Sequence, residues 1–153
     1  MSKYSLPKKD PAVSEENAHS QIMQLVDRYN IDVDNMGKEK REATEQALDY
    51  LLTEIVKGHV SIEEKEVGKS GRELCVTIYI QNRSPESNIE ELTFREMRGR
   101  DHVKMSEKGN DNQYKKMHNL LSSMCITPNG QHAIGQLRSA DASTAEWLST
   151  LFL

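Results

Sequence analysis

The spacing of apolar residues changes twice along the chain, and this change limits the fold more than any other feature of the sequence. Over residues 14–57 apolar side chains recur every three or four residues, which is the spacing of one face of an α-helix. Over residues 59–80 apolar and polar residues alternate, as they do in a β-strand with one buried face. After Gly99 the helical spacing returns. The sequence therefore predicts an α+β fold, with a small antiparallel sheet packed between N-terminal and C-terminal helices.

The predicted elements set the organisation of the chain. Residues 1–13 contain two prolines and no periodic pattern, which indicates a flexible arm. Residues 14–153 are predicted to form a single α+β domain. Within it we expect helices over 14–58, a β-hairpin followed by a third strand over 59–96, and helices again over 97–153. A sheet of about three strands is stable when helices cover its apolar face.

Two local patterns refine the C-terminal helices. Ser143 followed by Glu146 is the spacing of a capping box, so the last helix is predicted to begin at Ser143. The preceding helix, over residues 111–124, carries one stripe of larger side chains: Tyr114, Met117, Leu120, Leu121 and Met124.

Composition and charge exclude several classes of function. The chain has 20 basic and 24 acidic residues, a net charge of −4, which argues against nucleic acid as a partner but leaves a local basic patch open. A bilayer span needs about 20 consecutive apolar residues, and the apolar runs here are shorter. No basic start precedes a long apolar stretch, as it would in a secretory signal. We therefore expect a soluble cytoplasmic protein with no membrane partner.

The residues that usually carry chemistry are scattered. The five histidines and two cysteines show no spacing at which three or four donors would converge on a metal ion. The nucleophile and zinc motifs GxSxG, CxxC and HExxH do not occur. The sequence thus predicts no catalytic residue, no metal and no cofactor, and indicates a protein that acts by binding.

The C-terminal end is the first candidate for a binding surface. It is strongly apolar, and such an end must be buried in its own fold or against a partner. Both alternatives are open from the sequence. If the end is buried against a partner, the predicted contact residues are Trp147, Leu148, Leu151 and Phe152. The side chains that would line a groove are then Met117 and Leu121.

A run of mixed charge around Arg95 and Arg98 is the second candidate. Arg100 extends it, and Glu96 and Asp101 lie within it. Such a run is usually exposed or salt-bridged, because a few exposed charges contribute little binding energy. The alternative is a docking patch formed by Arg95 and Arg98.

The second half of the chain carries an ordered series of motifs. The strand Leu92-Thr93-Phe94-Arg95-Glu96 is followed by a Gly-Arg-Asp step and a leucine-containing helix. A step from Leu137 to Asp141 and a short final helix, with Leu148 and Phe152, complete it. Over about residues 89–153 this order resembles the small tail assembly chaperones of contractile-tailed and related phages. That family usually has a proline where Met97 stands, and the resemblance does not explain residues 1–80.

The resemblance implies a non-catalytic protein in the host cytoplasm that acts during phage morphogenesis. Such a protein would bind the long, mostly helical tape-measure protein, keep it soluble and recruit tail-tube subunits. An acidic protein with an apolar groove can shield the apolar stripes of a helix in this way. The alternatives are a structural or adaptor protein of the phage tail or baseplate, and a small regulatory module that binds nucleic acid through Arg95, Arg98, Arg100 and Lys104. The sequence leaves open whether the protein forms a homo-oligomer.

Overall fold

A computed structural model describes residues 11–83, 85–106 and 112–152 of the chain. It contains a three-stranded antiparallel sheet and six α-helices over these residues. The predicted α+β class is confirmed. Most of the predicted N-terminal arm, residues 1–10, and the terminal Leu153 lie outside the described residues.

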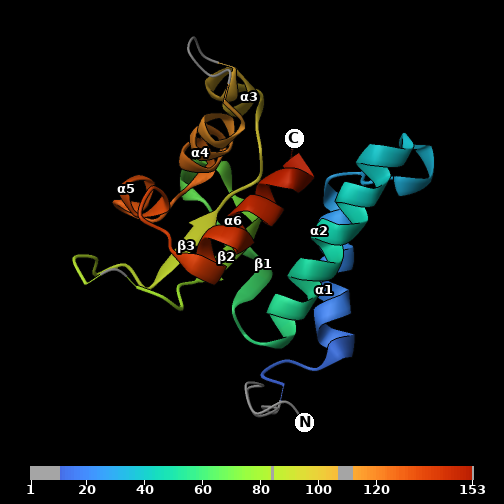
Figure 1. Ribbon diagram of the computed structural model, residues 1–153, viewed down its shortest axis with the longest axis horizontal. Helices are drawn as coiled ribbons and strands as arrows, with labels where there is room; N and C mark the ends of the chain where they lie inside the picture. The colour runs from blue at the N-terminus through green and yellow to red at the C-terminus, as the bar shows by residue number, and fades with distance from the viewer. Residues whose placement is uncertain (1–10, 84, 107–111, 153) are drawn as a thin grey trace.

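The sheet has the strand order β1-β2-β3, with β2 in the centre (Figure 1). The strands are β1 (Val60–Glu66), β2 (Arg72–Tyr79) and β3 (Glu91–Phe94). The register places one set of apolar side chains on a common face, and all of them are buried: Val60, Ile62, Leu74, Val76, Ile78, Leu92 and Phe94. Side chains alternate between the two faces of a strand, so this register fulfils the alternation in the sequence. The predicted hairpin and third strand are confirmed.

A short turn closes the hairpin at Gly68–Ser70. Gly68 and Gly71 both have positive φ, at 50° and 83°. Residues with a Cβ rarely adopt this conformation, so the two glycines let the chain reverse between β1 and β2.

Two helices precede the sheet. They are α1 (Glu15–Arg28) and α2 (Lys38–Val56). The Ser14 hydroxyl caps α1 by accepting from the Asn17 main-chain N–H at 3.1 Å, and Glu15 and Glu16 lie favourably in its first turn. The predicted starts of both helices agree with the structure to within one residue.

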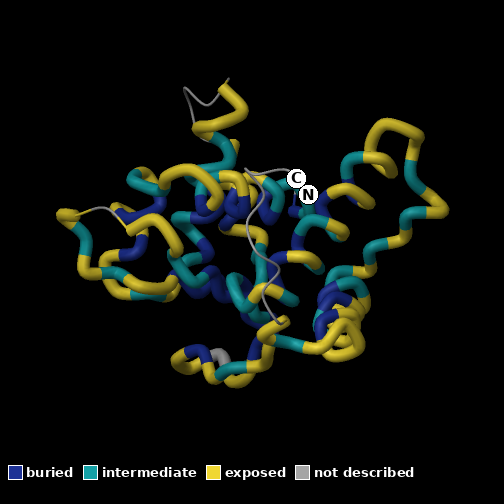
Figure 2. The backbone as a smooth tube through the Cα atoms, turned by 60° about the horizontal axis from the view of Figure 1, so that its bottom comes forward, coloured by how far each residue is buried: buried dark blue, intermediate teal, exposed yellow. Residues whose placement is uncertain are grey.

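Four helices follow the sheet. They are α3 (Gly99–Met105), α4 (Gln113–Met124), α5 (Gly130–Ile134) and α6 (Ser139–Phe152). Helix α6 lies across one face of the sheet and packs against α2 and α4 (Figure 1). The buried residues gather in the middle of the molecule, while exposed residues outline its periphery (Figure 2).

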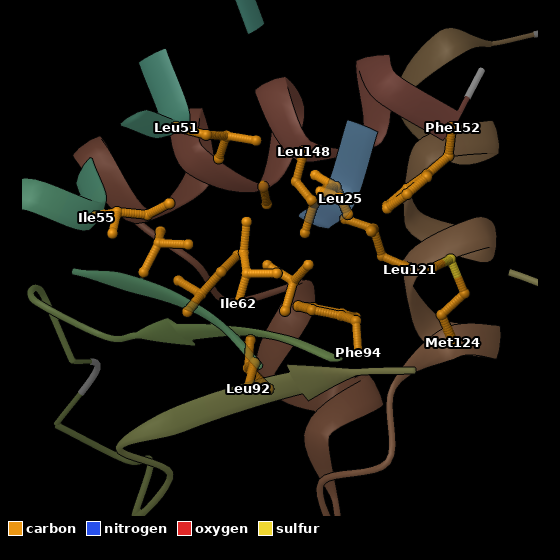
Figure 3. Close-up of a cluster of buried hydrophobic side chains, with 14 of the residues drawn as sticks. Leu25, Leu51, Ile55, Ile62, Leu92, Phe94, Leu121, Met124, Leu148 and Phe152 are labelled. Carbon is orange, nitrogen blue, oxygen red and sulfur yellow. The ribbon is translucent and has the colours of Figure 1, made fainter. Parts of the chain in front are cut away.

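One hydrophobic core joins the two helical parts of the chain. Its side chains come from α1, α2, the sheet, α4, α5 and α6 (Figure 3). The largest fully buried members include Leu25, Leu51, Ile55, Phe94 and Leu148. Burying a side chain of this size stabilises a fold by about 1.5–3 kcal/mol, so α1 and α2 belong to the same packed unit as the C-terminal half.

The last helix begins at Ser139, four residues before the predicted capping box at Ser143. The cause is Asp141, which is buried. Its carboxylate accepts the main-chain N–H groups of Gln81, at 3.0 Å, and Asn82, at 2.7 Å. These bonds fix the first turn of α6 to the end of β2 and place Ser143 inside the helix. The prediction from the capping box was therefore wrong.

We expect Asp141→Ala to lower the free energy of unfolding by about 1–3 kcal/mol, because two main-chain donors lose the buried carboxylate that accepts their hydrogen bonds. Urea denaturation measures the change. Asp49→Ala, at an exposed position in the middle of α2, is the matched control and should leave stability nearly unchanged. Equal midpoints for the two variants would show that Asp141 does not hold α6 to β2.

Candidate partner-binding surface

Helix α6 buries one apolar stripe in the core. Leu148 is 0% exposed and Phe152 is 5% exposed, and both pack with the fully buried Leu121 of α4 (Figure 3). The ring of Phe152 also lies 5.0 Å from the ring of Tyr29, measured between centroids. The structure corrects the expectation for Leu121, Leu148 and Phe152: they fill the space over the sheet and offer no exposed contact.

Tyr29 also holds the segment that follows β3. Its hydroxyl accepts the main-chain N–H of Met97 at 3.0 Å. Burial raises the pKa of Tyr29 to about 12, so the hydroxyl stays protonated at neutral pH. Met97 therefore uses an N–H that a proline at this position would lack.

The neighbouring stripe of α6 faces α2 and the surface. Trp147 stacks on Tyr50 of α2, with ring centroids 5.9 Å apart and ring planes inclined by 30°. The Tyr50 hydroxyl lies 3.4 Å from the Thr144 hydroxyl. Trp147 and Leu151 are both partly buried. Trp147 thus attaches α6 to α2. The side chains of Trp147 and Leu151 both keep some surface accessible to solvent.

A cleft of about 290 Å³ lies between the first half of α4 and the second half of α6. We call it the α4–α6 cleft; its lining residues are Gln113, Tyr114, Met117, Glu146, Ser149 and Thr150. Met117 is partly buried, and Tyr114 is 67% exposed. Among the predicted contact residues, Met117 therefore lies in a cleft, as expected of a side chain that lines a groove.

Tyr114 was not among the predicted contact residues. Its position on the apolar stripe of α4 pointed to the core with Leu120 and Leu121, but it occupies the first turn of the helix. At that end α4 extends beyond the core, so the apolar stripe of the helix reaches the surface. The signal that the sequence offered for an exposed contact residue was the position of Tyr114, an aromatic residue at the start of the stripe.

Arg95 lies inside the fold. It is 3% exposed and makes a bidentate ion pair with the fully buried Asp101, with both N–O distances at 2.8 Å. It also donates to the main-chain carbonyls of Glu96, at 2.7 Å, and Ser123, at 2.8 Å. The pair joins β3, α3 and α4. The expectation that Arg95 forms a docking patch is corrected, because its side chain is buried and paired with Asp101 inside the fold.

The environment of Asp101 determines its charge. Burial alone would raise its pKa, but hydrogen bonds from Arg95, the Ser123 hydroxyl and the Arg98 main-chain N–H outweigh this and lower the pKa to about 2. Asp101 is therefore ionised at neutral pH, and its negative charge is balanced by Arg95.

Arg98 is also engaged internally. Its guanidinium forms an ion pair with the buried Glu73 of β2, and its main-chain N–H donates to Asp101 at 2.6 Å. The Arg98 side chain is 32% exposed. The salt-bridged alternative is thus the arrangement found for Arg95 and Arg98.

A second depression, of about 1010 Å³, runs along β1, which is an edge strand. The Gln21 side-chain carbonyl of α1 accepts the outward main-chain N–H of Ile62 at 2.8 Å, and the Gln21 amide donates to Asn17 at 3.1 Å. This bond satisfies one of the outward main-chain N–H groups that would otherwise be open to a strand of another molecule. Most of the side chains that line this depression are amides and charged groups. The depression therefore lacks the apolar surface that would bind the apolar stripe of a partner helix.

The two cysteines are free thiols. Burial raises the pKa of the Cys75 and Cys125 thiols, which are free and remain protonated at neutral pH. Within the described residues no three His, Cys, Asp or Glu side chains lie close enough together to hold a metal ion. None of the helices in that part of the chain has the length and apolar character of a membrane-spanning segment.

Comparison with known proteins gave no match: no family model, no curated protein and no solved structure is significantly similar to this chain.

Proposed function

We propose that this protein is a non-catalytic tail assembly chaperone, which binds the tape-measure protein and helps to recruit tail-tube subunits in the host cytoplasm during phage morphogenesis. The observation that carries the proposal is the structural role of the residues behind the resemblance. Arg95 binds Asp101 across three elements, and Asp141 binds the end of β2. These residues are far apart in the sequence, and each makes a contact that holds two distant parts of the same fold together. Motif residues with this role are expected to recur at separate positions along the chain.

This scaffold determines where a partner would bind. With Leu148 and Phe152 in the core, α6 presents its other side, and the Arg95–Asp101 pair fixes the position of α4 beside it. The α4–α6 cleft is thus formed entirely within the segment that carries the resemblance. Among the exposed large apolar side chains of the described residues, Tyr114 has the largest exposed fraction.

The cleft suits weak, repeated binding to an apolar stripe. Tyr114 and Met117 would contact one or two apolar side chains of a helix, and the polar side chains of Glu146, Ser149 and Thr150 form the opposite wall. Tight interfaces need several buried aromatic or arginine anchors, so a cleft of about 290 Å³ supports reversible contacts. Reversibility is what a chaperone that leaves the finished particle requires.

The test is co-expression with the tape-measure protein of the same phage. The wild-type protein should keep the tape-measure protein in the soluble fraction. Tyr114→Ser should reduce this effect severalfold without unfolding the protein, because Tyr114 is 67% exposed. Met23→Ser on α1, which also removes an exposed apolar side chain (41% exposed), is the matched control and should behave like the wild type.

Two results would contradict the proposal. One is a tape-measure protein that stays insoluble with the wild-type protein. The other is recovery of this protein, in stoichiometric amount, from purified phage particles, which would favour the structural or adaptor alternative.

A further inference from the structure

The two walls of the α4–α6 cleft differ in their chemistry. On α4, Tyr114 and Met117 are three residues apart, so they lie on one face of the helix and present an aromatic ring and a thioether. On α6, Glu146, Ser149 and Thr150 lie at positions i, i+3 and i+4 and likewise share one face. The α4 wall therefore offers apolar surface, and the α6 wall offers polar atoms.

The α6 wall presents hydrogen-bond acceptors to the cleft. The hydroxyl groups of Ser149 and Thr150 both donate to the main-chain carbonyl of Glu146, at 2.7 and 3.0 Å. Their protons are thus used within α6, and the lone pairs of the two hydroxyl oxygens remain to accept a hydrogen bond. Glu146 is exposed, and its carboxylate adds an acceptor with a negative charge. A positively charged donor is the group that fits these acceptors best.

Core packing holds the two walls beside each other. Leu121 of α4, one turn beyond Met117, is fully buried and packs with Leu148 and Phe152 of α6 (Figure 3). The orientation that places Leu148 and Phe152 in the core also places Glu146 on the cleft side of α6. The cleft is therefore formed before a partner arrives, which lowers the entropic cost of binding.

We propose that the α4–α6 cleft binds an arginine side chain from a basic amphipathic helix of the partner protein. The guanidinium would stack on the ring of Tyr114 and donate to the Glu146 carboxylate, while its aliphatic stem lies along Met117. An apolar residue one turn away on the partner helix would contact the remainder of the α4 wall. This inference rests on the proposed function, because it concerns the same cleft, and it adds a charge requirement to the apolar stripe.

Charge distinguishes this ligand from other helices. A stripe flanked by acidic residues would be repelled by Glu146, whereas the net charge of −4 on the whole protein attracts a basic partner. Arginine suits the cleft better than lysine, because its planar guanidinium stacks on an aromatic ring and offers five donors, while an ammonium group is compact and strongly hydrated. A purely apolar stripe would use the α4 wall alone.

Two helical peptides test the proposal. Both are fluorescein-labelled, alanine-based and about 18 residues long, which is enough for a helix in water, and both carry leucines at helical spacing. One has an arginine one turn from a leucine, and the other has citrulline, the uncharged isostere of arginine, at that position. Fluorescence anisotropy with the full-length protein at low ionic strength measures both affinities. We expect the arginine peptide to bind roughly threefold to tenfold more tightly, as one exposed ion pair and one cation–π contact predict.

Variants and NMR assign the preference to the cleft. Glu146→Gln should remove it, so that the two peptides bind equally well. The control, Glu42→Gln, removes the same charge from an exposed position on α2 and should keep the preference of the wild type. Saturating arginine peptide should shift the methyl resonance of Met117 and leave that of Met23, which is 41% exposed on α1, unchanged.

Several results would overturn the inference. They are equal or tighter binding of the citrulline peptide by the wild-type protein, a preference for arginine that survives in Glu146→Gln, a shift of Met23 in place of Met117, and absence of binding by both peptides. Failure of the proposed function is distinguishable from these results, because it is judged by the solubility of the tape-measure protein in the co-expression test.

Discussion

Arg95→Met is expected to lower the free energy of unfolding by about 3–5 kcal/mol, because it leaves Asp101 buried with an unpaired charge. Asp101 is 0% exposed and so cannot recover its hydration without opening the contact between α3 and α4. Urea denaturation at neutral pH measures the loss. The control is Arg83→Met, which breaks an exposed ion pair with Glu90 and should change stability by less than about 1 kcal/mol.

The same pair predicts a dependence on pH. The pKa of Asp101 is about 2 in the folded protein and 3.8 in its unperturbed state. Between these values the unfolded chain binds the proton more strongly, so acid favours unfolding. The stabilisation is complete above about pH 4 and is lost as the pH falls towards 2. Wild-type stability should therefore fall more steeply over this range than that of Arg95→Met. Parallel curves would contradict the pairing.

Leu148→Ala is the second large effect, an expected loss of about 2–5 kcal/mol. Leu148 is fully buried between the sheet and the helices, and the substitution leaves a cavity there (Figure 3). Leu151→Ala, one turn along the helix at a partly buried position, should cost distinctly less. Thermal denaturation of both variants measures the difference. If Leu151→Ala were the more damaging, α6 would have to pack in a different orientation from the one described.

Local patterns account for the part of the fold that the sequence predicted. The hairpin follows from alternation at Val60 and Ile62, together with the glycines of its turn. The helices over 14–58 follow from apolar spacing and from the Ser14 cap. In each case the decisive residues are neighbours in the chain, so a short window of sequence contains the information.

The start of α6 could not be predicted in this way. Its first turn is fixed by Asp141, whose partners Gln81 and Asn82 are about 60 residues away. The local capping pattern at Ser143 is real in the sequence, but these long-range bonds determine where the helix begins. Arg95 is similar: its charge suggested the surface, and only its contact with Asp101 explains its burial.

The candidate site was predicted in part. The spacing predicts one apolar face on the last helix, with Leu148, Leu151 and Phe152 on it and Trp147 beside it. Which of these side chains enter the core depends on the position of the sheet, which the spacing does not contain. Met117 lies in the α4–α6 cleft, whereas Tyr114 becomes evident only when the end of α4 is seen to extend past the core.

Hydrogen–deuterium exchange of the complex tests the central claim most directly, that an apolar stripe of the tape-measure protein binds in the α4–α6 cleft. The measurement compares the protein alone with the protein bound to a soluble tape-measure fragment. We predict slower exchange in residues 112–117 and 146–152, and unchanged exchange in the first turns of α2, residues 38–45. Protection confined to α2, or no protection anywhere in a demonstrated complex, would contradict this claim.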